Sequence, residues 1–97
     1  MLKNIYNFGL LGAAGYIAPR HIKAIKDNYS ELIVACDKSD SVGVIDQYFK
    51  KTVLCKSLIS LQKFIDNNRL DYLSICTPNN LHYDHIKFAL NNNITPI

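Results

Sequence analysis

The most constraining feature of this sequence is the alternation of short β-branched runs with segments whose apolar residues recur at helical spacing. Strands are predicted at residues 5–11, 31–37, 52–55 and 70–78, and residues 94–97 resemble the opening of a fifth strand. Helices are predicted from residue 16 onward, over 41–49, after residue 57 and over 82–93. Strands that alternate with helices pair in parallel, with the helices packed on the faces of the sheet. The pattern predicts a doubly wound α/β sheet, a fold that by itself assigns no function.

Composition and charge argue against several classes of protein. Of the 97 residues, 48% are hydrophobic and 20% are charged, which is typical of a folded globular domain. The net charge of +3 comes from lysines scattered along the chain, whereas nucleic-acid-binding proteins gather basic residues on one face. No apolar run approaches the roughly 20 residues that span a bilayer, and the glycine-interrupted N-terminal run predicts a strand rather than an export signal. We therefore expect a cytoplasmic protein that binds neither nucleic acid nor a membrane.

The cysteines and histidines favour packing over metal binding. Cys36, Cys55 and Cys76 each lie inside an apolar stretch, which is typical of reduced, buried thiols. His82 and His85 share a predicted helical face, but the sequence supplies no third ligand for a metal. We therefore predict no metal site. We expect His82 at the start of a helix, facing a ligand crevice, and His85 on the surface.

A turn rich in small residues follows the first predicted strand, in the sequence GAAGYIA at residues 12–18. Its G-x-x-G-x-x-A spacing departs from the usual G-x-G-x-x-G, yet it meets the same physical needs. Gly12 suits a tight turn, Gly15 allows backbone to approach a pyrophosphate, and Ala18 permits close contact between helix and strand. The N-terminus of the following helix attracts an anion. Close packing without any ligand explains the small residues equally well.

Polar residues follow two further strands, at the sheet edge where ligands of doubly wound folds bind. Asp37 ends the second strand, where a carboxylate accepts hydrogen bonds from both ribose hydroxyls of an adenosine and repels a 2′-phosphate. The alternative role for Asp37 is to cap the next turn in solvent. Pro78 ends the fourth strand, and Asn79 or Asn80 is positioned to cap the following helix. Together with the glycine turn, Asp37 favours a dinucleotide site that prefers NAD to NADP.

Three segments together resemble one enzyme family. The strings GLLGAAGYIAPRH, ACD and SICTPNNLHYDHI, at residues 9–21, 35–37 and 74–86, are similar to the N-terminal half of the Gfo/Idh/MocA oxidoreductases. Within that family, GAAGYIAPRH and DKSDSVGVID resemble the dehydrogenases that oxidise C3 of UDP-N-acetylglucosamine-derived sugar acids for lipopolysaccharide. The resemblance implies a Rossmann-type doubly wound sheet, an NAD cofactor and hydride transfer to it.

The resemblance also implies where the cofactor lies. The residues that it places under the NAD pyrophosphate are Gly12, Ala13, Ala14, Gly15, Tyr16 and Ile17. Around the adenosine ribose it implies Asp37, Lys38 and Ser41. Along the cofactor toward the nicotinamide it implies Thr77, Pro78, Asn79 and His82. All of these are binding positions, and none is expected to be a catalytic residue.

The family's next motif, Glu-Lys-Pro, follows the fifth strand, whereas this sequence stops at Ile97 before it. The resemblance thus implies that residues 1–97 form the N-terminal dinucleotide-binding domain, with the sheet truncated at about the fifth strand and the C-terminal substrate domain absent. Because hydride transfer depends on positioning the substrate carbon against the nicotinamide, we expect cofactor binding without turnover. Nucleotide-sugar binding and a homo-oligomer are expected only of the full-length protein. The alternatives are a non-catalytic nucleotide-binding or interaction module, and the remnant of an interrupted gene.

Overall fold

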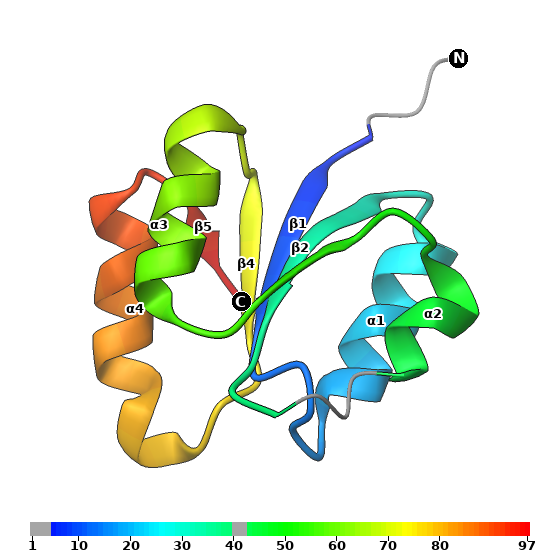
Figure 1. Ribbon diagram of the computed structural model, residues 1–97, viewed down its shortest axis with the longest axis horizontal. Helices are drawn as coiled ribbons and strands as arrows, with labels where there is room; N and C mark the ends of the chain where they lie inside the picture. The colour runs from blue at the N-terminus through cyan, green and yellow to red at the C-terminus, as the bar shows by residue number, and fades with distance from the viewer. Residues whose placement is uncertain (1–4, 40–42) are drawn as a thin grey trace.

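A computed structural model describes residues 5–39 and 43–97 of the chain. Its centre is a five-stranded parallel sheet with the strand order β3-β2-β1-β4-β5 (Figure 1). The strands are β1 (Asn7–Leu11), β2 (Glu31–Cys36), β3 (Val53–Cys55), β4 (Tyr72–Ile75) and β5 (Thr95–Pro96). The helices are α1 (Ala18–Asp27), α2 (Gly43–Tyr48), α3 (Leu58–Asn67) and α4 (His82–Asn91), with a short 3₁₀ turn, η1 (Asn79–Leu81), before α4. The predicted order of strands and helices is confirmed, with ends that differ by a few residues.

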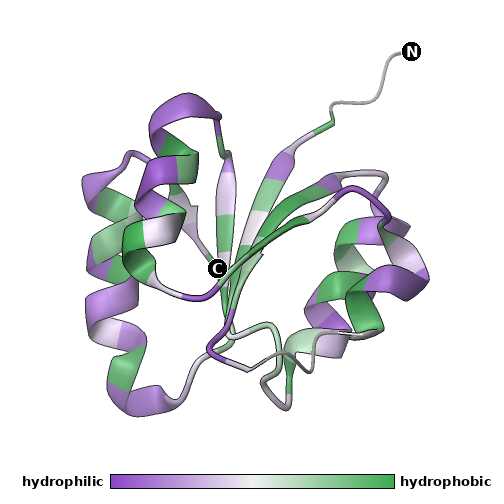
Figure 2. Ribbon diagram, viewed as in Figure 1, coloured by the Kyte–Doolittle hydropathy of each residue, from purple (hydrophilic) through white to green (hydrophobic). Residues whose placement is uncertain are grey.

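The helices cover the two faces of the sheet in pairs, α1 with α2 on one face and α3 with α4 on the other (Figure 1). Side chains alternate along each strand, so Leu10 packs in the core under α1 and α2, whereas Leu11 packs in the core under α3 and α4. Hydrophobic residues accordingly follow the strands and the helix sides that face them (Figure 2). No helix within the described residues is long and apolar enough to cross a membrane.

The strand order reverses at β1. From β1 the chain moves outward through β2 and β3, and it then returns across the sheet to β4 and β5 on the opposite side (Figure 1). The helices change face at the same step, because α3 is the connection that leads from β3 to β4. In doubly wound folds, ligands bind beyond the carboxyl ends of the strands at such a reversal. The ends of β1, β2 and β4 therefore define the candidate site.

The two helices on the second face begin in different ways. Ser57 caps α3, because its Oγ accepts a hydrogen bond of 3.1 Å from an amide in the first turn. The prediction that Asn79 or Asn80 caps α4 is wrong, because Leu81 is the N-cap residue and makes no side-chain cap bond. The chain instead forms η1, in which the Pro78 carbonyl accepts a hydrogen bond from the Leu81 amide. Both asparagines are used within this turn, ahead of the helix.

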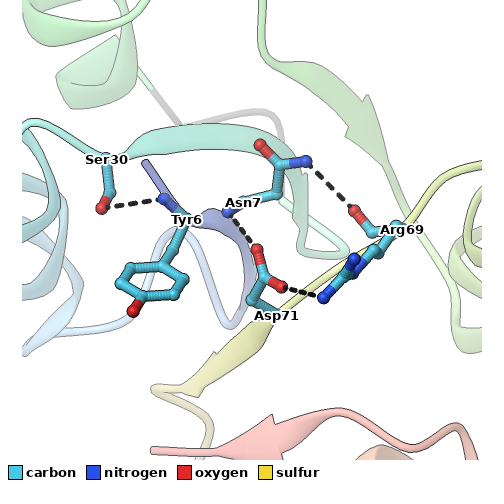
Figure 3. A network of polar contacts seen from close by, with 5 residues as sticks. All are labelled: Tyr6, Asn7, Ser30, Arg69 and Asp71. Atoms are coloured by element: carbon cyan, nitrogen blue, oxygen red, sulfur yellow. Dashed lines mark hydrogen bonds and ion pairs between the residues drawn. The ribbon is translucent and has the colours of Figure 1, made fainter. Parts of the chain in front are cut away.

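A network of polar contacts joins the amino ends of β1 and β4 (Figure 3). The Asn7 amide donates to Asp71 Oδ2 at 2.8 Å, and the Asn7 side chain donates to the Arg69 carbonyl at 3.3 Å. Arg69 also forms an ion pair of 3.3 Å with Asp71 Oδ1. On the other side of β1, the Tyr6 amide donates to Ser30 Oγ at 3.4 Å. These contacts fix β1 between its neighbours at the end of the sheet opposite to the candidate site.

Replacing Asp71 with alanine is expected to lower the free energy of unfolding by about 2 kcal/mol, because the Asn7 amide loses an ionised acceptor at a strand end. The Asp71 side chain is only 19% exposed, whereas that of Arg69 is 86% exposed. The matched variant Arg69→Ala removes only the ion pair, so its expected loss is below about 1 kcal/mol. Urea unfolding followed by circular dichroism measures both losses. Equal losses would contradict the role given to the Asn7–Asp71 bond.

Candidate functional site

A pocket of about 320 Å³ opens at the reversal of strand order. We call it the switch-point pocket. Its lining comes from the last residues of β1 and β2 and from the segments that follow β1, β2, β3 and β4. The lining residues are Leu11, Gly12, Gly15, Cys36, Asp37, Lys38, Lys56, Ser57, Leu58, Cys76, Thr77, Pro78, Leu81 and His85. Six of the predicted cofactor residues are among them: Gly12, Gly15, Asp37, Lys38, Thr77 and Pro78.

The glycine turn is packed against the end of β4. Gly12 has a φ of +83°, and a Cβ at this position would lie 2.7 Å from the Cys76 carbonyl carbon. A Cβ on Gly15 would lie 2.5 Å from the Cys76 carbonyl oxygen. Real Cβ atoms do not approach backbone this closely, so both positions require glycine for the turn to meet β4. Of the two explanations for the small residues, close packing is present in the structure, independently of any ligand.

The backbone of the turn is also tied to β2. The Gly12 and Ala13 amides both donate to the Cys36 carbonyl, at 2.8 and 3.2 Å. The Gly15 amide donates to the Gly12 carbonyl at 2.8 Å, and the Ala14 amide donates to Asp37 Oδ2 at 2.9 Å. The turn therefore has a fixed shape in which its first four amides already have acceptors.

The residues after the turn differ widely in burial. Tyr16 is 99% exposed, and Ile17 lines a separate groove beside α1 rather than the switch-point pocket. Ala18 is fully buried in the core beneath α1, as expected for close contact between helix and strand. The helix begins at Ala18, and Pro19 fits its first turn because the proline nitrogen needs no acceptor there.

Asp37 connects two turns at the end of β2. Besides its bond to the Ala14 amide, its Oδ1 accepts a hydrogen bond of 2.8 Å from the Ser39 amide. The capping role left open by the sequence is thus present, and the same carboxylate also holds the glycine turn. An ionised carboxylate has about four acceptor positions, so about two remain for further donors. Lys38 follows it as an exposed residue of the pocket lining, whereas Ser41 lies outside the described residues.

The end of β4 contributes a hydrogen-bonded group centred on Thr77. Its hydroxyl lies 2.8 Å from His85 Nδ1, and its carbonyl lies 2.6 Å from His82 Nε2. His85, which we expected on the surface, is only 9% exposed and lines the pocket. His82 and Asn79, which we expected along the cofactor, are not part of the pocket lining. Helix α4 begins at His82, as predicted, and its buried face is formed by His85 and Ala89.

Burial sets the protonation of the groups around the pocket. It lowers the pKa of His85, an effect to which His82 adds and which Asp84 opposes. Burial also raises the pKa of Cys36 to about 12, with a further contribution from the neighbouring Cys55 thiol. The imidazole of His85 is therefore neutral, and the Cys36 thiol protonated, near pH 7.

The cysteines are packing residues in this fold. Cys36 and Cys76 are buried and Cys55 is half-buried. Burial raises the pKa of Cys76 to about 11 and also raises the pKa of Cys55, so none of the three is an activated thiolate near pH 7. Cys36 and Cys55 are register partners on neighbouring strands. Within residues 5–39 and 43–97, no three metal-ligating side chains gather into a group.

Sequence reasoning missed one wall of the pocket. Lys56, Ser57 and Leu58 follow β3, and Leu81 belongs to η1. The rule that identified Asp37, namely the position directly after a parallel strand, applies equally to Lys56 after β3. Because a strand is predicted over 52–55, the sequence itself contains the signal that marks Lys56. Leu81 has no comparable signal, because its position depends on the η1 turn.

A parallel sheet whose order reverses at β1, with a glycine turn and a carboxylate at the reversal, defines the class of dinucleotide-binding α/β domains. Residues 6–97 match the model of the Gfo/Idh/MocA family, described as an oxidoreductase family with an NAD-binding Rossmann fold. The chain belongs to this family. The resemblance to this family stated from the sequence is thereby confirmed, together with the Rossmann-type fold that it implied.

Solved structures of several dehydrogenases superpose on the chain. The WlbA (WbpB) dehydrogenase from Thermus thermophilus, solved with NAD and UDP-GlcNAcA, is 35% identical with a TM-score of 0.90, over 95% of this chain and 32% of that one. The Bordetella pertussis WlbA dehydrogenase, solved with NADH and UDP-GlcNAcA, is 24% identical with a TM-score of 0.69, over 96% of this chain and 28% of that one. At 24% identity, the match to the Bordetella enzyme shows only that the two proteins share a fold. The chain spans about a third of the length of the Thermus enzyme.

Proposed function

We propose that the switch-point pocket binds NAD and that Asp37 is the residue that selects it over NADP. The observation that carries this proposal is the Asp37 carboxylate, which lies at the pocket beside the glycine turn with about two acceptor positions still available. Two ribose hydroxyls supply two donors. A 2′-phosphate removes one of these donors and brings negative charge next to a carboxylate. The residues present therefore fit a non-phosphorylated adenosine ribose.

The pyrophosphate of the cofactor is assigned to the start of α1. The amides of residues 12–15 already have acceptors, as described above. Among the described residues, the Tyr16 and Ile17 amides have no backbone acceptor, and they precede the first turn of α1. Unpaired amides at a helix N-terminus bind anions. In this proposal Gly12, Ala13, Ala14 and Gly15 shape the turn, and Tyr16 and Ile17 donate to the pyrophosphate through their backbone.

The remaining predicted residues are assigned as follows. Lys38 borders the adenosine ribose with Asp37, and the role of Ser41, which lies outside the described residues, stays a prediction from the resemblance. Thr77 and Pro78 line the pocket at the end of β4, on the side of the cofactor that leads to the nicotinamide. Asn79 and His82 do not line the pocket, and in this proposal they act on the residues that do. His82 bonds the Thr77 carbonyl, and Asn79 is the first residue of the η1 turn. NAD, when bound, supplies the hydride acceptor.

We further propose that residues 1–97 act as the cofactor domain of a longer dehydrogenase, which transfers hydride from C3 of a UDP-linked N-acetylated sugar acid to NAD. The support is the 35% identity over 95% of this chain to an enzyme solved with NAD and UDP-GlcNAcA. In a 97-residue chain that spans about a third of that enzyme, we expect cofactor binding without turnover. The nucleotide-sugar site and any homo-oligomer contacts are assigned to the rest of the longer protein.

The test is calorimetric titration of the purified 97-residue chain with NAD and with NADP. We expect NAD to bind at least about tenfold more tightly, which corresponds to about 1.4 kcal/mol of discrimination at the ribose. Circular dichroism and a dispersed amide NMR spectrum establish beforehand that the chain is folded. A folded chain that binds neither cofactor, or that binds NADP as tightly as NAD, would overturn the proposal.

A further inference from the structure

Thr77 is fixed in two separate ways by two histidines of the same helix. Its carbonyl only accepts hydrogen bonds, so His82 Nε2, at 2.6 Å, carries a proton and donates it. Its hydroxyl lies 2.8 Å from His85 Nδ1, and either atom is able to donate in that contact. The backbone of Thr77 is thus positioned by one imidazole, and its side chain by another.

The contact between Thr77 and His85 determines what the hydroxyl offers to a ligand. A neutral imidazole that carries its proton on Nε2 accepts the threonine proton at Nδ1, which leaves the hydroxyl's lone pairs available to the pocket. An imidazole with a proton on Nδ1 donates to the hydroxyl, whose own proton then turns to the pocket. The state of His85 therefore sets whether Thr77 acts as an acceptor or as a donor toward the cofactor.

The surroundings of His85 keep its contact with Thr77 away from solvent and hold it in place. The side chain is buried, and it lines the pocket together with Thr77 and Leu81. Burial is also the main reason that its pKa is lowered, so the ring is neutral near pH 7. A neutral, buried ring with one nitrogen bonded to a hydroxyl has little freedom to turn.

We propose that His85 is a positioning residue of the cofactor site, which orients the Thr77 hydroxyl and thereby strengthens NAD binding without touching the cofactor itself. This inference rests on the proposed function of the switch-point pocket. It assigns a role to a histidine that the sequence pattern placed on the surface. It also separates His85 from His82, which acts on the Thr77 backbone alone.

The test uses the 97-residue chain and four variants: Thr77→Val, His85→Ala, the double variant, and His85→Asn. Each single truncation is expected to weaken NAD binding by about five- to tenfold, the effect of one lost hydrogen bond. Because both substitutions remove the same contact, NAD binding by the double variant is expected to be weakened by no more than about tenfold. Asparagine places a polar atom at the branch where Nδ1 lies, so His85→Asn is expected to stay within about twofold of the unsubstituted chain. His21→Ala, on α1, is the control and leaves the affinity unchanged.

A second measurement does not depend on the affinity. Two-bond proton–nitrogen NMR spectra report which imidazole nitrogen carries the proton, and Thr77→Val is expected to change the Nδ1 signal of His85 while leaving that of His21 unchanged. This readout remains available if His85→Ala fails to fold.

The outcomes separate the two proposals. Unchanged NAD affinity in Thr77→Val and His85→Ala, effects that multiply in the double variant, or an unchanged His85 Nδ1 signal in Thr77→Val would overturn this inference and leave NAD binding in place. An unsubstituted, folded chain that does not bind NAD would overturn the proposed function and this inference together.

Discussion

Replacing Gly15 with alanine is expected to lower the free energy of unfolding by about 3 kcal/mol, near the upper end of the usual cost of overpacking. The new Cβ would lie 2.5 Å from the Cys76 carbonyl oxygen, which is backbone and moves only if β4 moves with it. A domain of this size has a total stability of roughly 5–15 kcal/mol, so the loss is a large fraction of it. Urea unfolding monitored by circular dichroism measures the effect.

The chain offers a matched control for this substitution. A Cβ on Gly43 meets nothing within 4 Å, and Gly43 lies in α2. Gly43→Ala is therefore expected to be neutral or to stabilise the protein by about 0.5–1 kcal/mol, because alanine reduces the freedom of the unfolded chain and favours helix. Similar stabilities for the two variants would contradict the packing of the glycine turn against β4.

Replacing Asp37 with alanine is expected to weaken NAD binding by about 10- to 100-fold, because hydrogen bonds to a charged acceptor contribute about 1.5–3 kcal/mol. NADP binding is expected to change less, since the 2′-phosphate no longer meets a carboxylate. The Ala14 and Ser39 amides lose their acceptor at the same time, so a loss of about 1–2 kcal/mol in stability is also expected. Calorimetric titration with both cofactors, at temperatures well below the unfolding midpoint, separates the two effects.

Asp46→Ala is the control for Asp37→Ala. It removes the same charge from α2, and Asp46 is not part of the pocket lining. NAD affinity equal to that of the unsubstituted chain is expected for Asp46→Ala. If Asp37→Ala also bound NAD with unchanged affinity, the assignment of the ribose to Asp37 would be wrong.

The sequence predicts the elements of this fold well, because the determinants are local. The β-branched run before Asp37 forms a buried strand in the structure. Ser57 caps α3, the helix that is predicted to begin after residue 57. The requirement for glycine at 12 and 15 is also visible in the sequence. The partner that requires it is not, because the Cys76 backbone lies more than sixty positions away in the chain and meets the turn only through the pairing of β1 with β4.

His82 and His85 show where local reasoning stops. Helix α4 begins at His82, as predicted, but the local sequence does not determine which face of that helix packs against the sheet. His85, which was expected on the surface, lies on the buried face, whereas the side chain of His82 bonds the Thr77 carbonyl beside the pocket. The capping prediction for the two asparagines was wrong because the sequence around Pro78 gave no sign of η1.

The two hydrogen bonds of Asp37 restrict how the cofactor preference of such a domain is redesigned. The usual way to admit a 2′-phosphate is to replace the acidic residue after β2 with a small or basic one. Here that exchange also removes the acceptor of the Ala14 amide, and the glycine turn loses a constraint on its shape. A designer who wants an NADP-dependent version of this chain must therefore introduce a new acceptor for that amide along with the new phosphate-binding residue. Cofactor choice and loop shape are engineered here as one unit.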